Sequence, residues 1–184
     1  MKKHIAPVIA LFSICAAVTA LVACANFLTE DTIASNAEKA AQESMRTLIS
    51  DASEFQAITA DANEAYEAKD TNGNVIGYIF VTVSNKGYGG EMSVMTALDT
   101  DGIVMGIEII ADEETQGLGK NAHNKSFLDQ YIGKDTDEYT VVKGEKTSDS
   151  EITAITGATK TTDAVTEAVN VAKVSLKKYL GGDK

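Results

Sequence analysis

The densest group of residues that could do chemistry lies near the end of the chain, just before a final helical stretch. It consists of seven consecutive residues: Thr156, Gly157, Ala158, Thr159, Lys160, Thr161 and Thr162. A glycine lets the backbone approach a ligand closely, the hydroxyls can donate hydrogen bonds, and the first N–H groups of a helix point out of its positive end. This combination favours an anion such as phosphate. Taken alone, however, such residues more often only cap a helix and form a turn.

A second candidate loop follows a predicted strand in the middle of the chain. The residues that we assign to a ligand site there are Glu114, Thr115, Gly117, Leu118 and Gly119. Two glycines around one leucine make a tight loop whose backbone can approach a flat ligand, although most such loops are only turns. The acidic residues 112–114 lack the spacing of a calcium-binding loop, so we expect a solvated acidic turn.

A third loop, Gly87-Tyr88-Gly89-Gly90, places one aromatic ring between glycines. Tyr88 could cover a ring-shaped ligand or simply close a hairpin. His123 is expected to be an ordinary surface residue. With two histidines in the chain, the sequence indicates no Ser-His-Asp or Cys-His catalytic set.

The composition excludes several classes of protein. Of the 184 residues, 44% are hydrophobic and 23% are charged, which is typical of a globular chain. The net charge of −11 argues against a nucleic-acid partner, which needs a basic face. The two cysteines, Cys15 and Cys24, both lie in the apolar N-terminal stretch. The rest of the chain therefore holds no cysteine zinc site or iron–sulfur cluster, and any redox chemistry must come from an organic cofactor.

Residues 1–28 are interpreted as a membrane segment. No charged side chain occurs from Ile5 to Thr29, and about 20 apolar residues suffice to cross a bilayer. Lys2 and Lys3 predict that the N-terminus stays in the cytoplasm. Three interpretations remain open: a cleaved signal peptide, a lipoprotein lipidated at Cys24, and an uncleaved single-pass anchor. We favour the anchor because the stretch exceeds the roughly 7–15 apolar residues of a signal peptide. All three place the remaining chain on the extracytoplasmic side of the cell membrane.

Residues 29–184 are expected to form one α+β domain. A helix is predicted over residues 31–48, where Ala, Glu, Lys and Gln are frequent. The β-rich runs predict an antiparallel meander with strands over residues 65–68, 75–83, 92–98 and 103–110. Beyond the meander we expect a short helix near 124–131, strands at 139–142 and 152–155, and a final amphipathic helix over 161–179. Strands followed by helices are typical of an α+β fold.

Five motifs occur together in the order of one known family. Residues 156–161 match the pattern Ser/Thr-Gly-Ala-Thr/Ser-x-Ser/Thr, and the other matching segments are residues 87–90, 99–103, 114–119 and 126–131. The chain thereby resembles the covalent FMN-binding domain family. The similarity extends through the N-terminal segment and residues 28–33, and it is greatest to the G subunits of Rnf ion-translocating electron-transport complexes.

The resemblance implies a covalently bound FMN. In the family the last Thr/Ser of the motif, here Thr161, carries FMN through a phosphoester bond that a flavin transferase installs from FAD, with cleavage of the FAD pyrophosphate and release of AMP. We expect Thr161 to be exposed, with the flavin ring against the loop 114–119. Two positions depart from the family pattern. Thr153 stands where an aspartate is common, which bears on recognition by the transferase, and Gln116 stands where proline is favoured.

The resemblance also implies a function and partners. The chain would be a redox carrier among other Rnf-type membrane subunits, in a complex that passes electrons between ferredoxin and NAD⁺ and couples this to movement of Na⁺ or H⁺. Two alternatives remain open. One is a free-standing flavin lipoprotein anchored by Cys24. The other is a cofactor-free structural or binding module, for which Thr153 is the best support.

Overall fold

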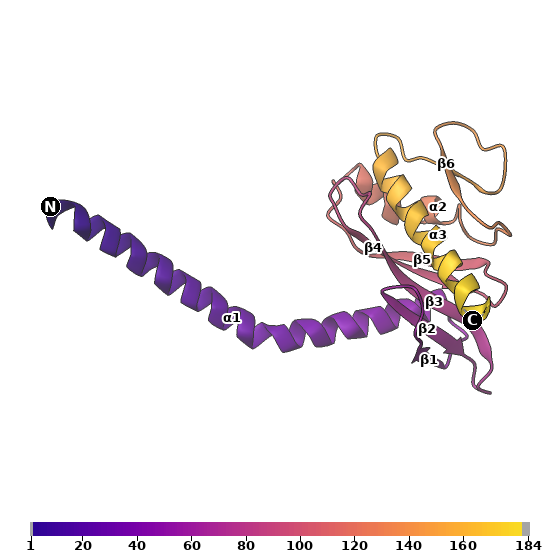
Figure 1. Cartoon of the computed structure of the whole chain (residues 1–184), viewed down its shortest axis with the longest axis horizontal. Helices are drawn as coiled ribbons and strands as arrows, with labels where there is room; N and C mark the ends of the chain where they lie inside the picture. The colour runs from indigo at the N-terminus through magenta and orange to yellow at the C-terminus, as the bar shows by residue number, and fades with distance from the viewer. Residues whose placement is uncertain (1, 182–184) are drawn as a thin grey trace. The chain divides into compact units, whose positions relative to one another are not determined.

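The computed structural model describes residues 2–181 and divides into two compact units, with the division between Gln42 and Glu43. One helix, α1 (Lys2–Leu48), forms the first unit and supplies the beginning of the second (Figure 1). Within α1 the segment Pro7–Glu30, 24 residues with a mean hydropathy of 2.6, is long and apolar enough to cross a membrane. The helix predicted over residues 31–48 is confirmed as part of α1. The proposed boundary between residues 28 and 29 concerns the bilayer and stays a prediction.

The second unit contains the predicted antiparallel meander. Five strands pair in sequence order: β1 (Glu54–Ala57), β2 (Glu64–Lys69), β3 (Val75–Ser84), β4 (Met92–Leu98) and β5 (Val104–Ala111). Strand β1 was not predicted, because this edge strand is mostly exposed and carries no apolar run that would signal it.

Two hairpins of the meander use the same turn chemistry. Asp70 Oδ1 accepts hydrogen bonds from the N–H groups of Asn72 and Asn74, and Asp99 Oδ1 accepts them from Asp101 and Ile103. Gly73 and Gly102 complete these turns with φ of 83° and 84°. Such values favour glycine, so these short sequences fix the register of the strands on either side.

Helix α3 (Thr159–Gly181) packs across one face of the sheet (Figure 1). Phe80, Val94 and Leu98 from the strands are fully buried in a cluster with Val165 and Val169 from the helix. Thr82 also donates a hydrogen bond to the carbonyl oxygen of Ala168 at 2.9 Å. The helix predicted over residues 161–179 is confirmed and begins two residues earlier.

The opposite face of the sheet is also buried. Alternate residues of the strands, including Ile79 and Met95, are fully buried but do not belong to the α3 cluster. The last turns of α1 supply Met45, and Ile49 follows directly; their exposed fractions are 3% and 2%. Leu48 lies directly against the sheet at Gly106, where a Cβ would lie 2.8 Å from Leu48 Cδ2. The sheet is therefore the middle layer between two helical elements.

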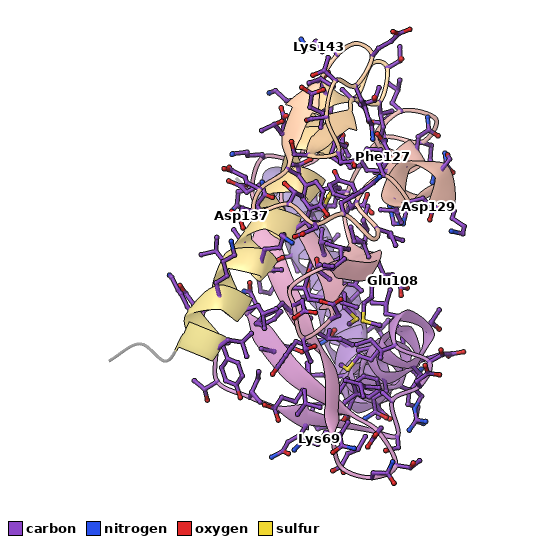
Figure 2. The ribbon with its side chains drawn as sticks, turned by 90° about the vertical axis from the view of Figure 1, so that its right-hand side faces the viewer. Lys69, Glu108, Phe127, Asp129, Asp137 and Lys143 are labelled. Atoms are coloured by element: carbon purple, nitrogen blue, oxygen red, sulfur yellow. The ribbon has the colours of Figure 1, made fainter. Side chains whose placement is uncertain are left out.

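The remaining elements lie at one end of the domain. They are the 3₁₀ helix η1 (Gly119–His123), the short helix α2 (Lys125–Leu128) and a parallel pair, β6 (Thr140–Val142) and β7 (Glu151–Thr153). Figure 2 shows Lys143, after β6, at one end of the domain and Lys69, in β2, at the other. The helix predicted near 124–131 is wrong in length, because the chain leaves α2 through turns that end at Gly133 with a φ of 70°.

Candidate functional site

Three loops that are far apart in the sequence meet at one cavity, at the N-terminal end of α3. The cavity has a volume of about 620 Å³. Its lining comes from all three candidate loops and consists of Tyr88, Glu114, Thr115, Leu118, Gly119, Gly157, Ala158, Thr159, Lys160 and Thr161. The fold thus brings together most of the residues that the sequence marked, and it adds Tyr88 to the two groups assigned to the site.

Three of the assigned residues do not line this cavity. Thr156 is exposed in the turn before α3, and Gly117 supports the turn before η1 with a φ of 76°. Thr162 is fully buried, and its hydroxyl donates to the Ala158 carbonyl at 3.2 Å and accepts from the Ile155 N–H at 3.0 Å. The Thr162 hydroxyl therefore fastens the start of α3 to the segment before it.

Thr161 has an unusual environment for a hydroxyl group. The side chain lines the cavity, yet its exposed fraction is 0%, and Oγ1 has no hydrogen-bond partner among the described residues. The expectation that Thr161 is exposed is wrong, because it lies on the core face of α3, three and four residues before the buried Ala164 and Val165. A buried hydroxyl without a partner costs about 1–3 kcal/mol.

The end of the cavity at Thr161 suits an anion. Lys160 is exposed and lines the cavity, and the positive end of the 23-residue helix α3 lies beside it. Gly157 turns the backbone into the helix with a φ of 79°, and a Cβ there would lie 3.2 Å from Leu118 Cδ2. The start of α3 thus approaches the loop 114–119 closely. An oxygen-rich anionic group that binds at Thr161 would give the Thr161 hydroxyl the partner that it lacks.

The acidic residues 112–114 do not form the solvated turn that we expected. The side chain of Asp112 is only 3% exposed and pairs with Lys120 at 2.9 Å and with His123 Nε2 at 2.7 Å. Its Oδ1 also accepts the N–H of Glu114 at 2.9 Å. Glu114 is 7% exposed, whereas Glu113 is exposed. His123 is thus a partner of Asp112, a pairing that the sequence did not indicate because Asp112 and His123 lie on different elements.

These contacts determine how Asp112 responds to acid. Burial alone would raise the pKa of Asp112, but hydrogen bonds from Lys120, from the Glu114 N–H and from His123 outweigh burial and hold the pKa below its usual range. A carboxylate with a lowered pKa stabilises the fold above its unfolded pKa of about 3.9, and this contribution is lost as the pH falls through the lower folded value.

We therefore expect Asp112→Asn to weaken the pH dependence of stability. In urea unfolding the parent domain should lose stability between about pH 5 and pH 2 more steeply than the variant, which lacks the titrating group. Glu113→Gln is the matched control, because Glu113 is an exposed neighbour in the same loop. Equal pH slopes for the parent and Asp112→Asn would contradict this account.

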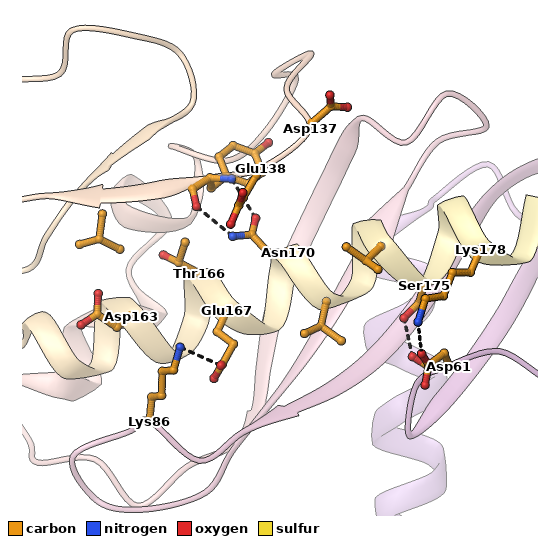
Figure 3. A pocket seen from close by; sticks show the side chains of 14 residues that line it. Asp61, Lys86, Asp137, Glu138, Asp163, Thr166, Glu167, Asn170, Ser175 and Lys178 are labelled. Carbon is orange, nitrogen blue, oxygen red and sulfur yellow. Dashed lines mark hydrogen bonds and ion pairs between the residues drawn. The ribbon is translucent and has the colours of Figure 1, made fainter. Parts of the chain in front are cut away.

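A larger cavity, of about 990 Å³, lies along α3 beyond Thr161 (Figure 3). Charged side chains in its walls form ion pairs with one another: Lys86 pairs with Glu167 at 2.8 Å and Lys178 with Asp61 at 2.6 Å. The side-chain amide of Asn170 also bonds to the backbone N–H and C=O groups of Tyr139. None of the three candidate loops lines this larger cavity, so we do not assign the ligand site to it on the basis of volume.

Comparisons with known proteins show the family to which the chain belongs. The model of the FMN-binding domain matches residues 87–173, a range that contains all three loops. The G subunit of the proton-translocating ferredoxin:NAD(+) oxidoreductase complex of Clostridium ljungdahlii is 35% identical over 88% of this chain and 85% of its own length. The chain belongs to the family of G subunits of ion-translocating oxidoreductase complexes. Another relative in this family, the G subunit of the Na(+)-translocating complex of Acetobacterium woodii, is also 35% identical, over 88% of this chain and 86% of its own length.

Solved structures support the fold of this G-subunit family. The NqrC protein of Shewanella oneidensis superposes with a TM-score of 0.53 at 15% identity, over 73% of this chain and 74% of its own. The C subunit of the Na(+)-translocating NADH-quinone reductase of Parabacteroides distasonis gives a TM-score of 0.52 at 20% identity, over 66% and 63% of the two chains. At these identities the likeness establishes a shared α+β architecture and no more.

Proposed function

We propose that this chain is an electron-transfer component of an Rnf-type membrane complex and that it carries FMN in the cavity at the start of α3, bound through its phosphate to Thr161. The buried Thr161 hydroxyl, which lines the cavity without a hydrogen-bond partner among the described residues, is the observation that carries this proposal. The similarity to the G subunits of two ferredoxin:NAD(+) oxidoreductase complexes supports the reaction class.

Each part of the cavity has a task in this proposal. The isoalloxazine ring of a bound FMN supplies the electron chemistry, and the protein supplies its position and surroundings. Lys160 and the N–H groups at the start of α3 stabilise the phosphate. The side chain of Leu118 and the exposed ring of Tyr88 provide apolar surface in the same cavity.

The N-terminal helix has a separate task. We propose that it is an uncleaved, single-pass anchor with its N-terminus in the cytoplasm, because Lys2 and Lys3 precede the apolar segment. The flavin domain then lies on the extracytoplasmic side. Pro7–Glu30 carries no charged residue before Glu30, so one such helix offers no polar path for an ion. Coupling to Na⁺ or H⁺ is assigned to the other membrane subunits of the complex.

Covalent loading tests the proposed function directly. The chain is produced with and without a flavin transferase, and the denatured protein is examined for flavin fluorescence on a gel and for the added mass of FMN on the peptide that contains Thr161. Label that depends on the transferase supports the proposal. Colourless protein under both conditions would favour a structural or binding module without a cofactor.

Thr153 provides a second test of covalent loading. It ends β7, and its backbone is held by Gln130, whose side-chain oxygen accepts the Thr153 N–H at 2.9 Å. Because the backbone makes this bond, Thr153→Asp should keep the fold. The variant restores the acidic residue that is common in the family, and we expect a larger labelled fraction at limiting transferase. Thr153→Asn is the control of similar size without charge. An equal gain in both variants would show that charge is not the cause.

A further inference from the structure

Two walls of the flavin cavity are joined by one buried carboxylate. Glu114 Oε1 accepts the backbone N–H of Tyr88 at 2.7 Å and lies 3.5 Å from that of Gly89. Hydrogen bonds to a charged group are stronger than neutral ones. This contact therefore connects the loop 87–90 to the loop 113–119, across 26 residues of sequence.

The glycines of both loops allow this close approach. A Cβ built at Gly119 would lie 2.2 Å from Glu114 Oε2, and one built at Gly89 would lie 2.2 Å from the Glu113 carbonyl oxygen. Neither distance is possible for real atoms. Since neither glycine has a positive φ, Gly89 is required by contact between the two loops, and Gly119 is required by contact with Glu114 within its own loop.

The backbone of Glu114 is itself held in place by the side chain of Asp112. Asp112 Oδ1 accepts the Glu114 N–H, and the same carboxylate pairs with Lys120 and His123 on the far side of the loop. Both ends of the loop are thereby tied to one buried group. The side chain of Glu114 extends from a fixed backbone.

We propose that Glu114 is a positioning residue: it latches the loop 87–90 in place and so holds Tyr88 against the ring of the bound flavin. This inference rests on the proposed function for the identity of the ligand. Tyr88 is 74% exposed although it lines the cavity, which is an unfavourable place for a large ring unless a flat ligand covers it. The Glu114 carboxylate binds the backbone of residue 88, so it fixes where the Tyr88 ring is presented to the cavity.

The first experiment tests the hydrogen bond between the Tyr88 N–H and the Glu114 carboxylate in protein without flavin. Amide hydrogen exchange of Tyr88 is followed by NMR in the parent domain, Glu114→Ala, Glu114→Gln and Glu113→Gln. We expect exchange to be about tenfold or more faster in Glu114→Ala, because the acceptor is lost. The amide oxygen of Gln can accept the same bond and should restore most of the protection, and Glu113→Gln should match the parent. Unchanged exchange in a folded Glu114→Ala domain would overturn the latch.

The second experiment measures the mobility of the flavin ring, as fluorescence anisotropy, in flavin-loaded protein well below its unfolding temperature. Glu114→Ala should keep FMN attached, because the attachment oxygen is on α3, but its fluorescence anisotropy should fall as the ring gains freedom. Gly119→Ala should reproduce this fall, because its Cβ displaces the Glu114 carboxylate while Glu114 remains. Glu114→Gln should stay close to the parent.

The outcomes separate this inference from the proposed function. Anisotropy that stays at the parent value in both Glu114→Ala and Gly119→Ala would overturn the positioning role even if the latch exists. If the parent takes up no FMN with the transferase present, the proposed function and the role toward the flavin fall together, while hydrogen exchange still decides whether the latch exists.

Discussion

Thr161→Val is expected to abolish covalent flavin and, at the same time, to stabilise the flavin-free domain. Valine has nearly the shape of threonine but no hydroxyl, so the attachment oxygen is removed while the packing is kept. Because Thr161 Oγ1 is buried without a hydrogen-bond partner among the described residues, its removal should relieve a penalty of about 1–3 kcal/mol. Fluorescence on a denaturing gel measures the label, and urea unfolding of the unloaded domain measures the gain.

The controls for Thr161 follow from its neighbours. Thr161→Ser keeps the hydroxyl and should retain label. Thr159→Ala removes another hydroxyl from the same cavity and should also leave the label in place. Thr162→Ala is a poor control, because its hydroxyl is the acceptor for the Ile155 N–H. Label that survives in Thr161→Val but is lost in Thr159→Ala would move the attachment to Thr159, and a destabilised Thr161→Val domain would contradict the account of the isolated hydroxyl.

Ile49→Ala is expected to be among the most destabilising single substitutions in the flavin domain, with a loss of about 2–5 kcal/mol in the free energy of unfolding. Ile49 is 2% exposed, and its Cδ1 lies 3.1 Å from the place that a Cβ on Gly77 would occupy. Shortening it leaves a cavity between the end of α1 and the sheet. Urea unfolding compares the variant with Thr47→Ala, an exposed position two residues earlier.

The packing of Met45 and Ile49 against the sheet also predicts how many N-terminal residues can be removed without unfolding the domain. Removing residues 1–30 should leave a folded, monomeric domain, because Met45 and Ile49 remain to cover the sheet. Removing residues 1–50 should expose Ile79 and Met95 and give aggregated or unfolded protein. A stable, soluble domain that begins at residue 51 would show that the end of α1 is not part of the core.

Local sequence was a good guide to elements whose signal is local. The run 75–83 is rich in β-branched residues and the run 92–98 is mostly apolar. Asp70 and Asp99 form the adjacent turns with nearby backbone groups, so the meander could be predicted without tertiary information. Strand β1 and the 3₁₀ helix η1 escaped prediction. The first is a mostly exposed edge that pairs only because β2 offers its free side, and the second forms where the loop 114–119 folds back onto itself.

The candidate site likewise has features that the local sequence predicts and features that depend on tertiary contacts. The sequence by itself determined the three loops, the threonine-rich start of the last helix and, through their order, the resemblance to FMN-binding domains. Only the tertiary structure decided that the loops share one cavity, that Thr161 is buried with an isolated hydroxyl while Thr162 is fully bonded, and that Asp112 and Glu114 are buried links. The physical reason is that motifs depend on neighbours along the chain, whereas burial and hydrogen-bond partners depend on atoms that approach from distant segments. Thr161 and Thr162 are adjacent and chemically identical, and only the packing around the start of α3 gives them different roles.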